Sequence, residues 1–551
     1  MIELLHTPEG VRDICGNECR DKLVLQNKLM DCMHRHGYMD IQTPSFEYFD
    51  VFSKERGTVP SKDMYKFFDR EGNTLVLRPD MTPSIARFVA KYYRDEKGPI
   101  QLCYCGNTYI NNESYQGRLK ETTQLGAELM NDDSVQADAD MLKLTIECIL
   151  ASGIEEFQIE IGNADFFKGL VEDCNLSEED EESLRVLVKT KNFPGAEALL
   201  SDKSIGNEDK ELLLRIPELF GSFDKLSEIR SMTKNARSLN ALDRLSEIYS
   251  ILKKDGYERY ISLDFGMLSK YRYYTGIIFR AITYGSGDAI ASGGRYDNLV
   301  SQFGMNAPAI GMSITVDSLM NAIERQGIQN VMNREHHQEY ITVALAKGRL
   351  AEKAMEILTK AGYSCEDMKD KNTRKLIFTN EEQKMRFFLA KANDVPTYVE
   401  YGAADIGIVG KDTILEEGRK LYEVIDFNMG RCRMCVAGPK EAAELLGSGK
   451  VIRVATKYPA IAKDYFLNVK HQSVEIIKLN GSIELAPIVG LSEVIVDIVE
   501  TGSTLRENGL EVLEEVVPLS ARMVVNQVSM KMEQDRIRKL ISDIRNVLNA
   551  R

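Results

Sequence analysis

The chain of 551 residues contains no tryptophan, only six histidines and 14 prolines, and no long apolar run. A helix that spans a bilayer needs about 20 consecutive apolar residues, so the sequence predicts no membrane segment. The first residues, MIELLHTPEGVRD, lack a basic stretch followed by an apolar core. No secretory signal is therefore expected, and we expect a cytoplasmic protein.

Acidic residues outnumber basic ones. Lysine and arginine number 70 against 84 acidic residues, which leaves a formal net charge of −14. This balance argues against binding to nucleic acid by bulk electrostatics, and we expect no nucleic-acid partner. The ten cysteines are scattered, and the close pairs Cys103/Cys105 and Cys432/Cys435 have no further ligands at suitable spacing. We therefore expect neither a disulfide framework nor a bound metal at these cysteines.

The length predicts roughly three or four domains. Residues 1–325 have the pattern of a mixed α/β unit, and within it residues 166–256 are almost wholly helical. In that block, Ser177 followed by five acidic residues is typical of a helix start with Ser177 as N-cap. Residues 326–339 are polar without an apolar period, which indicates a linker.

From residue 340 to residue 551, short strands and helices alternate. This alternation predicts largely parallel sheets, arranged as two lobes with a cleft between them. We assign about 340–430 together with 519–551 to the first lobe. The second lobe is then about 431–518, and the chain would pass between the lobes twice.

One stretch in this second half, Val494–Leu505 (VIVDIVETGSTL), carries the clearest chemical signal. Its first half is apolar and β-branched, as in a buried strand. The turn Glu500–Thr504 then offers backbone N–H groups and hydroxyls, which favour a phosphate. Asp497 and Glu500 add carboxylates that can accept hydrogen bonds from sugar hydroxyls. The stretch therefore favours a phosphosugar, and it resembles the loop with which phosphoribosyltransferases bind phosphoribosyl pyrophosphate (PRPP).

Residues of about 4–325 resemble the catalytic domain of class II aminoacyl-tRNA synthetases, and specifically the histidyl-tRNA synthetases. The resemblance rests on TPEGVRD, LRPDMTP, QLCYCGNTY with GRLKETTQLGAE, RYYTGIIF and SGGRYDNLV. It implies an antiparallel sheet, with the helical block at 166–256 as an inserted domain.

Three cations of that family are missing. The resemblance implies arginines for ATP and the amino acid at the positions that are Ile110, Ser269 and Ser318 here. An apolar or hydroxyl side chain cannot replace a guanidinium at a phosphate. The anticodon-binding domain expected after this region is also absent, so we expect no aminoacylation.

The amino-acid pocket of that family is better preserved. The residues that match it are Asp80, Thr82, Gln124, Glu128, Tyr273 and Tyr274, with Asp80 standing where the family has Glu. Carboxylate and amide acceptors suit the ammonium and imidazole N–H groups of histidine. This half thus resembles the regulatory subunit of short-form ATP phosphoribosyltransferases, which implies inhibition by histidine. The alternative is that these polar residues only satisfy one another.

Residues 340–551 resemble the catalytic subunit of ATP phosphoribosyltransferases over essentially their whole length. The matching motifs are ALAKGRL, NDVPTYVEYGAADIGIVGKD, ATKYP, NGSIELAPIVGLSEVIVDIVETGSTL and SARMVVN. The resemblance implies a two-lobed fold similar to periplasmic binding proteins. It also implies the first step of histidine biosynthesis, in which ATP and PRPP give N1-(5-phosphoribosyl)-ATP and pyrophosphate.

The resemblance and the residue chemistry together assign roles in this reaction. The PRPP 5′-phosphate is assigned to Thr501, Gly502, Ser503 and Thr504, and the ribose hydroxyls to Asp497 and Glu500. Phosphates of ATP are assigned to Lys347, Gly348, Arg349 and Lys457. Charge on the leaving group is assigned to Arg374 and Lys391, although the family usually has Arg at the position of Lys391. Magnesium is expected as an ion carried by the pyrophosphate of the substrate.

Two alternatives remain open at this point. Lys411 and Lys457 are equally compatible with solvated surface positions. The whole chain could also be a histidyl-tRNA synthetase fused to a two-lobed small-molecule-binding module, for which Ile110, Ser269 and Ser318 are the contrary evidence. Because class II synthetase folds usually dimerise, we expect a homo-oligomer.

Overall fold

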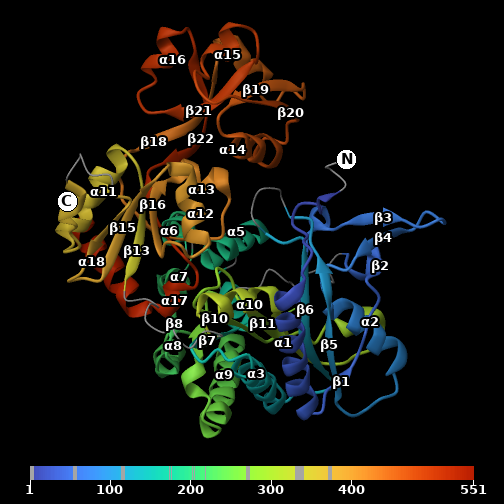
Figure 1. The fold of residues 1–551 in the computed structure, drawn as a ribbon. Coiled ribbons are helices and arrows are strands. Elements are labelled where there is room, and N and C mark those ends of the chain that lie inside the picture. Colours follow the sequence, from blue (N-terminus) through green and yellow to red (C-terminus); the bar gives the residue numbers. More distant parts are fainter. Residues whose placement is uncertain are drawn as a thin grey trace. The chain divides into compact units, whose positions relative to one another are not determined.

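The computed structural model of the chain separates into two compact units, Met1–His337 and Gln338–Arg551 (Figure 1). It describes residues 5–53, 59–112, 118–172, 174, 176–190, 192–201, 203, 205, 207–216, 219–267, 274–328, 340–369 and 375–550. Among these residues, no helix combines the length and the apolar character that crossing a membrane requires.

A nine-stranded sheet organises the first unit. In spatial order its strands are β1 (Met39–Asp40), β5 (Ile100–Tyr109), β6 (Glu121–Met130), β12 (Ala309–Thr315), β11 (Ala291–Arg295), β10 (Ile277–Thr283), β7 (Phe157–Asn163), β9 (Ile261–Asp264) and β8 (Phe220–Gly221). Neighbours are antiparallel except in the pairs β1–β5 and β7–β9. The predicted antiparallel sheet is therefore confirmed. A smaller sheet contains β2 (Phe46–Tyr48), β4 (Thr74–Leu77) and β3 (Lys66–Phe68).

Strand β5 illustrates why this sheet is buried on both faces. Successive side chains of a strand point to opposite faces, and here Leu102 and Tyr104 enter one core while Cys103 enters another. Helix α2 (Thr82–Tyr92) shares the core of Leu102 and Tyr104. Helices α1 (Gly16–Arg35) and α3 (Val135–Ala151) share the core of Cys103, as their apolar stripes require.

Helices dominate the segment between β7 and β9, as predicted. They are α4 (Ala164–Glu172), α5 (Glu178–Lys189), α6 (Phe193–Ser201), α7 (Asn207–Arg215), α8 (Leu226–Ser231) and α9 (Ala236–Lys254). The hydroxyl of Ser177 accepts a hydrogen bond from the backbone N–H of Asp180 at 3.1 Å, which confirms Ser177 as the N-cap of α5. Helix α10 (Val316–Arg325) is the last element described in this unit.

The second unit contains two sheets, drawn in yellow to red in Figure 1. The six-stranded sheet has the order β14 (Ile377–Asn380), β15 (Met385–Ala390), β13 (Ile341–Ala346), β16 (Ile406–Gly410), β23 (Ala521–Val525) and β17 (Tyr422–Asp426). The five-stranded sheet has the order β20 (Val474–Lys478), β19 (Ile452–Thr456), β21 (Val494–Val499), β18 (Cys432–Gly438) and β22 (Glu511–Leu519). We call them the first-lobe sheet and the second-lobe sheet.

The prediction of largely parallel sheets is wrong in one respect. Two of the five strand pairs of the first-lobe sheet are parallel, and so are two of the four pairs in the second-lobe sheet. The reason is the double crossing of the chain between the sheets. It leaves the first sheet after β17 and returns at β23, which enters antiparallel to both β16 and β17.

The helices of the second unit follow the strands closely. They are α11 (Arg349–Lys360), α12 (Val395–Glu400), α13 (Lys411–Glu417), α14 (Pro459–Asp464), α15 (Leu485–Ile488), α16 (Ser503–Glu507), α17 (Ser529–Met532) and α18 (Gln534–Asn549). Three of them, α11, α13 and α14, begin within three residues of a parallel strand's end. Their preceding loops therefore gather at the carboxyl ends of the strands, where ligands bind in open α/β sheets.

Candidate active site and regulatory pocket

Two neighbouring strand ends build the candidate site in the second-lobe sheet. Strands β19 and β21 are parallel, and Thr456 pairs with Val496. The Thr456 hydroxyl donates to the Val496 carbonyl at 2.6 Å and accepts from the backbone N–H of Tyr458 at 2.8 Å. The next residue on each strand, Lys457 and Asp497, therefore lies at the same edge. The charge of Lys457 acts on Asp497, so these two predicted site residues are brought together.

Burial raises the pKa of the Asp497 carboxyl, and the negative charge of Glu484 adds to the increase. The backbone N–H of Ile498, which donates to Asp497 at 2.8 Å, and the Lys457 ammonium act in the opposite direction. A half-buried carboxylate with one cation beside it is suited to accept hydrogen bonds from a polar ligand.

The loop at residues 500–504 after β21 is the one predicted to bind a phosphate, and we call it the cradle. Gly502 has φ +71°, a left-handed conformation that glycine adopts without strain. Around it, the hydroxyls of Thr501 and Ser503 lie 3.0 Å apart, and the backbone N–H of Ser503 points to the Thr501 hydroxyl at 3.4 Å. Glu500, Thr501, Ser503 and Thr504 are exposed. The sequence analysis missed Arg506, whose guanidinium donates to the Thr501 carbonyl at 3.2 Å; its place one turn into α16 was the available signal.

The first-lobe sheet contributes lysines in the same way. Strands β13 and β15 are parallel with Ala346 opposite Ala390, and the backbone N–H of Lys347 donates to the Ala390 carbonyl at 2.9 Å. Lys347 and Lys391 therefore leave neighbouring strand ends, and both are exposed. Gly348 has φ +107°, which lets the chain turn into α11 at Arg349. Arg374 lies outside the described residues.

Lys411 does not occupy a solvated surface position. Its ammonium forms a salt bridge with Glu423, and only 14% of the lysine side chain and 8% of the glutamate side chain are exposed. Arg522 contacts the same carboxylate at 3.2 Å. Both cations are thus engaged in a buried ion cluster at the start of α13. Lys457, in contrast, is exposed, so its assignment to a phosphate stays a prediction.

The two lobes of this unit touch beside the candidate site. The Glu416 carboxylate on α13 accepts hydrogen bonds from the backbone N–H groups of Ala460 at 3.0 and 3.1 Å and of Ile461 at 3.2 Å, at the start of α14. Asp412 of the first lobe also accepts a hydrogen bond from the Tyr458 hydroxyl. Helix α14 begins two residues after Lys457, so these contacts position that lysine.

A buried polar cluster in the first unit contains several residues predicted to bind histidine. The Thr82 hydroxyl donates to Glu128 Oε1 at 2.7 Å, and the Tyr296 hydroxyl donates to Glu128 Oε2. Glu128 is 1% exposed. Asp80 lies close enough to act on Glu128 electrostatically, and its carboxylate accepts from the backbone N–H of Met81 at 2.7 Å.

The electrostatics of this pocket favour an added positive charge. Burial raises the pKa of Glu128 to about 8, and the charge of Asp80 adds to the increase, against the hydrogen bonds from Thr82 and Tyr296. Burial and the Glu128 charge together also raise the pKa values of Tyr104 and Tyr296 above their ordinary range. An ammonium group placed here would relieve the cost of ionising Glu128.

Two further predicted residues, Gln124 and Tyr274, lie on the same side of the sheet as Glu128. Gln124 shares a face of β6 with Glu128, and its buried Oε1 has no hydrogen-bond partner among the described residues. The ring of Tyr274 passes beside Gly294, where a β-carbon would lie 2.6 Å from Cε1 of the tyrosine. Tyr273 lies outside the described residues. An unsatisfied amide oxygen in a buried pocket is a feature that a polar ligand would explain.

Two residues of this cluster, Tyr104 and Tyr296, were not predicted from the sequence. Both are fully buried and lie within electrostatic reach of Glu128. Tyr104 could have been found from strand alternation, because it stands opposite Gly126 on the face of β6 that carries Glu128. Tyr296 follows β11 and is 168 residues from Glu128 in the chain, so no local pattern indicated that the two lie together.

The described synthetase positions carry no replacement cation. Ile110 follows β5, and its backbone N–H donates to the Lys120 carbonyl at 2.9 Å. Arg78 lies beside Gly106, but its guanidinium donates to the carbonyls of Thr43, Pro44 and Asn107 at 2.6 to 3.2 Å. Two of the three guanidinium nitrogens, Nε and Nη1, are therefore engaged by main-chain carbonyls.

Comparisons with known families match both halves. The histidyl-tRNA synthetase family matches residues 10–319, and the ATP phosphoribosyltransferase family matches residues 391–546. The chain is 79% identical over 210 residues to the ATP phosphoribosyltransferase of Lachnoclostridium phytofermentans, covering 38% of this chain and 98% of the relative. It is 43% identical over 325 residues to the ATP phosphoribosyltransferase regulatory subunit of Acetivibrio thermocellus, covering 59% of this chain and 78% of the relative.

A solved structure supports the fold of the first half. It is the crystal structure of an ATP phosphoribosyltransferase regulatory subunit/histidyl-tRNA synthetase from Bacillus halodurans C, with 27% sequence identity and a TM-score of 0.55. The match covers 71% of this chain and 99% of that chain.

Fold, site and comparisons together define a phosphoribosyltransferase whose catalytic lobes follow a class II synthetase-like half. The chain belongs to the ATP phosphoribosyltransferase family and carries the regulatory and the catalytic polypeptide of that enzyme in one chain. The resemblance stated from the sequence is thereby confirmed.

Proposed function

We propose that the second unit transfers the phosphoribosyl group of PRPP to N1 of ATP, and that histidine bound in the first unit inhibits this step. The observation that carries the catalytic part is the shared edge of β19 and β21. Lys457 follows β19, Asp497 lies on the paired strand β21, and the loop at 500–504 comes directly after β21, which supports a shared binding role for these residues.

The cradle would bind the 5′-phosphate of PRPP. The hydroxyls of Thr501, Ser503 and Thr504 are exposed around the left-handed Gly502, and the hydrogen bond between Thr501 and Ser503 would give way to bonds to the phosphate. Asp497 on β21 and Glu500 directly after β21 would accept hydrogen bonds from the ribose hydroxyls. This arrangement would fix the ribose relative to its phosphate, and the reaction depends on such orientation.

Cations of the first-lobe sheet would neutralise the other phosphates. Lys347 and Lys391 leave adjacent strand ends and are exposed, and Arg349 begins α11 one residue after Gly348. We assign Lys347, Gly348 and Arg349 to ATP phosphates and Lys391, with Arg374, to the leaving pyrophosphate. Magnesium bound to the substrate pyrophosphate would supply further positive charge.

The chemistry itself needs little from a general base. The bond between ribose C1 and the pyrophosphate oxygen breaks, and the lone pair of adenine N1 forms the new bond to C1. The transition state carries positive charge on the ribose and negative charge on the leaving group. The carboxylates of Asp497 and Glu500 would stabilise the positive charge on the ribose, and Lys391 would stabilise the negative charge on the leaving group.

Histidine is the ligand we propose for the pocket around Glu128. Its ammonium would meet Asp80 and Glu128, and the free Oε1 of Gln124 would accept one further N–H. Thr82, Tyr273 and Tyr274 would complete the pocket. A homo-oligomer is part of the proposal, because class II synthetase-like folds usually dimerise.

The decisive measurement is pyrophosphate release from ATP and PRPP by the full chain, with and without histidine. Release that requires both substrates and falls with histidine supports the proposal, and no release refutes it. Histidine-dependent exchange of pyrophosphate into ATP, in the absence of PRPP, would instead favour the synthetase alternative. Loss of histidine inhibition with catalysis retained in Glu128→Gln would assign the regulatory site, whereas unchanged inhibition would place it elsewhere.

A further inference from the structure

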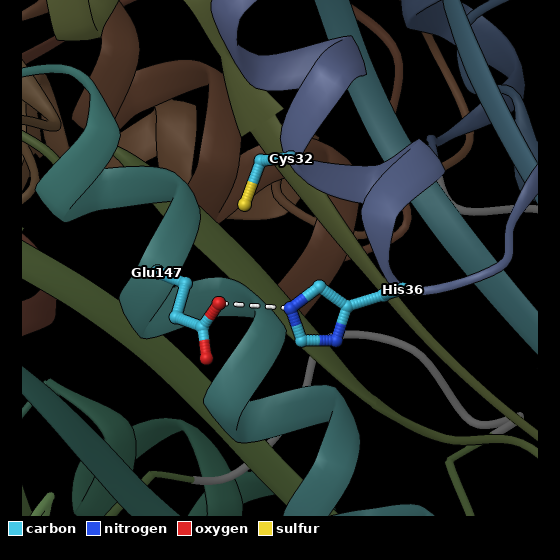
Figure 2. A group of neighbouring side chains, drawn as sticks. All are labelled: Cys32, His36 and Glu147. Carbon is cyan, nitrogen blue, oxygen red and sulfur yellow. Dashed lines mark hydrogen bonds and ion pairs between the residues drawn. The ribbon is translucent and has the colours of Figure 1, made fainter.

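A third group of reactive side chains lies outside both sites, between the end of α1 and α3. Figure 2 shows Cys32 and His36 pointing toward Glu147 of α3. The ligand atoms of these three residues all lie within 4.8 Å of one another. The closest approach is between His36 Nε2 and Glu147 Oε2, at 2.8 Å.

The helices explain why these residues meet. Cys32 and His36 are four residues apart, and such residues share one face of a helix. The same face of α1 carries Leu25 and Leu29 into the core that α3 also enters. Burial of the two apolar stripes therefore aligns the end of α1 with Glu147, although 111 residues separate His36 from Glu147.

Thiolate, imidazole and carboxylate are the ligands that zinc prefers. Zinc bonds of about 2.0 to 2.3 Å in tetrahedral geometry place the ligand atoms about 3.3 to 3.6 Å apart. The hydrogen bond between His36 and Glu147 is shorter than this, and 4.8 Å is the upper limit for the other pairs. Small rotations of the side chains would therefore bring all three atoms to coordination distance.

The surroundings orient two of the three ligands. The Tyr257 hydroxyl donates to Glu147 Oε1 at 2.8 Å and leaves Oε2 directed at His36. The Cys148 thiol forms a hydrogen bond with the sulfur of Cys32. Such second interactions fix the ligands of metal sites. Cys32 is 1% exposed, whereas the side chains of His36 and Glu147 are 31% and 35% exposed, so an ion can enter from their side.

A neighbouring group provides a comparison. His34, Asp40 and Cys103 also satisfy the distance criterion, but 69% of the Asp40 side chain is exposed. The Cys103 thiol lies 3.8 Å from Asp40 as a hydrogen-bond donor, and burial together with Asp40 keeps it protonated by raising its pKa to about 12. Because the carboxylate of this group is largely solvated, it is the weaker candidate and serves as the control.

We propose that Cys32, His36 and Glu147 bind one Zn²⁺, with a water molecule as the fourth ligand, and that the ion ties the end of α1 to α3. This site is separate from the phosphate cradle and from the pocket around Glu128. The ion replaces the hydrogen bond between His36 and Glu147, and its role is structural.

The test uses the reduced full chain, stripped with a chelator and then titrated with Co²⁺ and Zn²⁺. We expect one Co²⁺ per chain with a thiolate-to-cobalt charge-transfer band that Zn²⁺ removes, together with a rise in melting temperature on adding Zn²⁺. Cys32→Ser should lose the band, and His36→Gln and Glu147→Gln should weaken binding at least tenfold.

The control variants His34→Gln and Cys103→Ser should retain the band and the stoichiometry. The proposal is overturned if the wild-type chain gives no thiolate band, if Cys32→Ser keeps it, or if the control variants lose it. Because Cys32 is buried and its variant could fold poorly, the half-exposed His36→Gln, checked by far-ultraviolet circular dichroism, decides the outcome alone. If the His36→Gln chain folds and binds Zn²⁺ with unchanged affinity, His36 and Glu147 form only an ion pair and the proposal is overturned.

Discussion

A β-carbon on residue 311 would lie 1.6 Å from Oε2 of Glu128, so Gly311 on β12 makes room for the buried carboxylate on β6. The two residues are directly paired across these antiparallel strands. In the Gly311→Ala chain the carboxylate must move away from Thr82 and Tyr296. We expect histidine inhibition to weaken at least tenfold, with catalysis in the absence of histidine retained, and overpacking to cost about 1–3 kcal/mol of stability.

Inhibition curves and thermal melts of Gly311→Ala check this expectation. Gly98→Ala is the matched control, because a β-carbon there would lie at an ordinary 3.4 Å from Glu96. Inhibition by histidine that is equal in both variants would show that the Glu128 pocket does not bind the inhibitor.

Proton release is the expected signature of histidine binding. Burial raises the pKa of Glu128 to about 8, so near neutral pH the empty pocket holds a protonated carboxyl. The ammonium of the ligand favours the ionised form, and binding should release close to one proton. Affinity should rise with pH by up to about tenfold per unit until about pH 8.

Calorimetry in buffers of different ionisation enthalpy measures this release, and Glu128→Gln removes the titrating group. The pKa of Glu128 is about 8 in the folded chain and about 4.5 in the unfolded chain. Between these pH values the folded chain binds more protons, so without histidine the contribution of Glu128 to stability falls as pH rises through this range. Equal proton release by the wild type and Glu128→Gln would contradict the assignment.

Two lysines that look alike in the sequence should respond differently to substitution. Lys391 is exposed at a strand end, so Lys391→Met should lower turnover about tenfold or more and leave stability unchanged, because the leaving group loses a charge. Lys391→Arg should restore most of the activity.

Lys411→Met leaves Glu423 without one of its two buried cations, and it should cost about 1–3 kcal/mol of stability. Initial rates measure the effect on turnover, and urea unfolding measures the effect on stability. If Lys391→Met lowers stability and Lys411→Met lowers turnover, the two assigned roles are reversed.

The sequence predicted those elements whose residues are chosen by local chemistry alone. The N-cap at Ser177 depends on local chemistry, and it was found. Edge strands such as β17 and β22 leave a weaker pattern in the sequence. Strand β22 contains Glu511 and Pro518 and pairs with β18 through two register shifts, because an edge strand tolerates charge, proline and bulges.

Long-range polar contacts limited the prediction of the sites. The partner of Lys411 is only 12 residues away, yet nothing in the sequence indicates that β17 turns Glu423 toward it. The hydroxyl that holds Glu128 comes from Tyr296, and the carboxylate that meets His36 comes from Glu147. Such pairs depend on which strands and helices pack together, so they become visible only when the fold is known.

The contact between lobes should affect substrate binding through α14. Glu416→Ala removes the acceptor for the N–H groups of Ala460 and Ile461. Loss of such an N-terminal acceptor costs about 0.5–2 kcal/mol. Because Lys457 lies two residues before α14, we also expect a higher KM for a phosphate-bearing substrate, with a smaller change in kcat. Glu444→Ala, an exposed change in the second lobe, is the control. Equal KM values in the two variants would show that the contact between the lobes does not affect substrate binding.

Glu500 provides the sharpest test of the cradle at 500–504. The side chain is exposed, so Glu500→Gln should change the free energy of unfolding by no more than about 0.5 kcal/mol. If its carboxylate binds the ribose hydroxyls, a charged hydrogen bond worth about 1.5–3 kcal/mol is lost, and turnover should fall about 10- to 100-fold. Glu507→Gln, at the other end of α16 and also exposed, should leave turnover unchanged. Pyrophosphate release measured at saturating ATP and PRPP, alongside a thermal melt, gives both quantities. Normal turnover in a folded Glu500→Gln chain would remove Glu500 from the site and leave Asp497 as the carboxylate that orients the ribose.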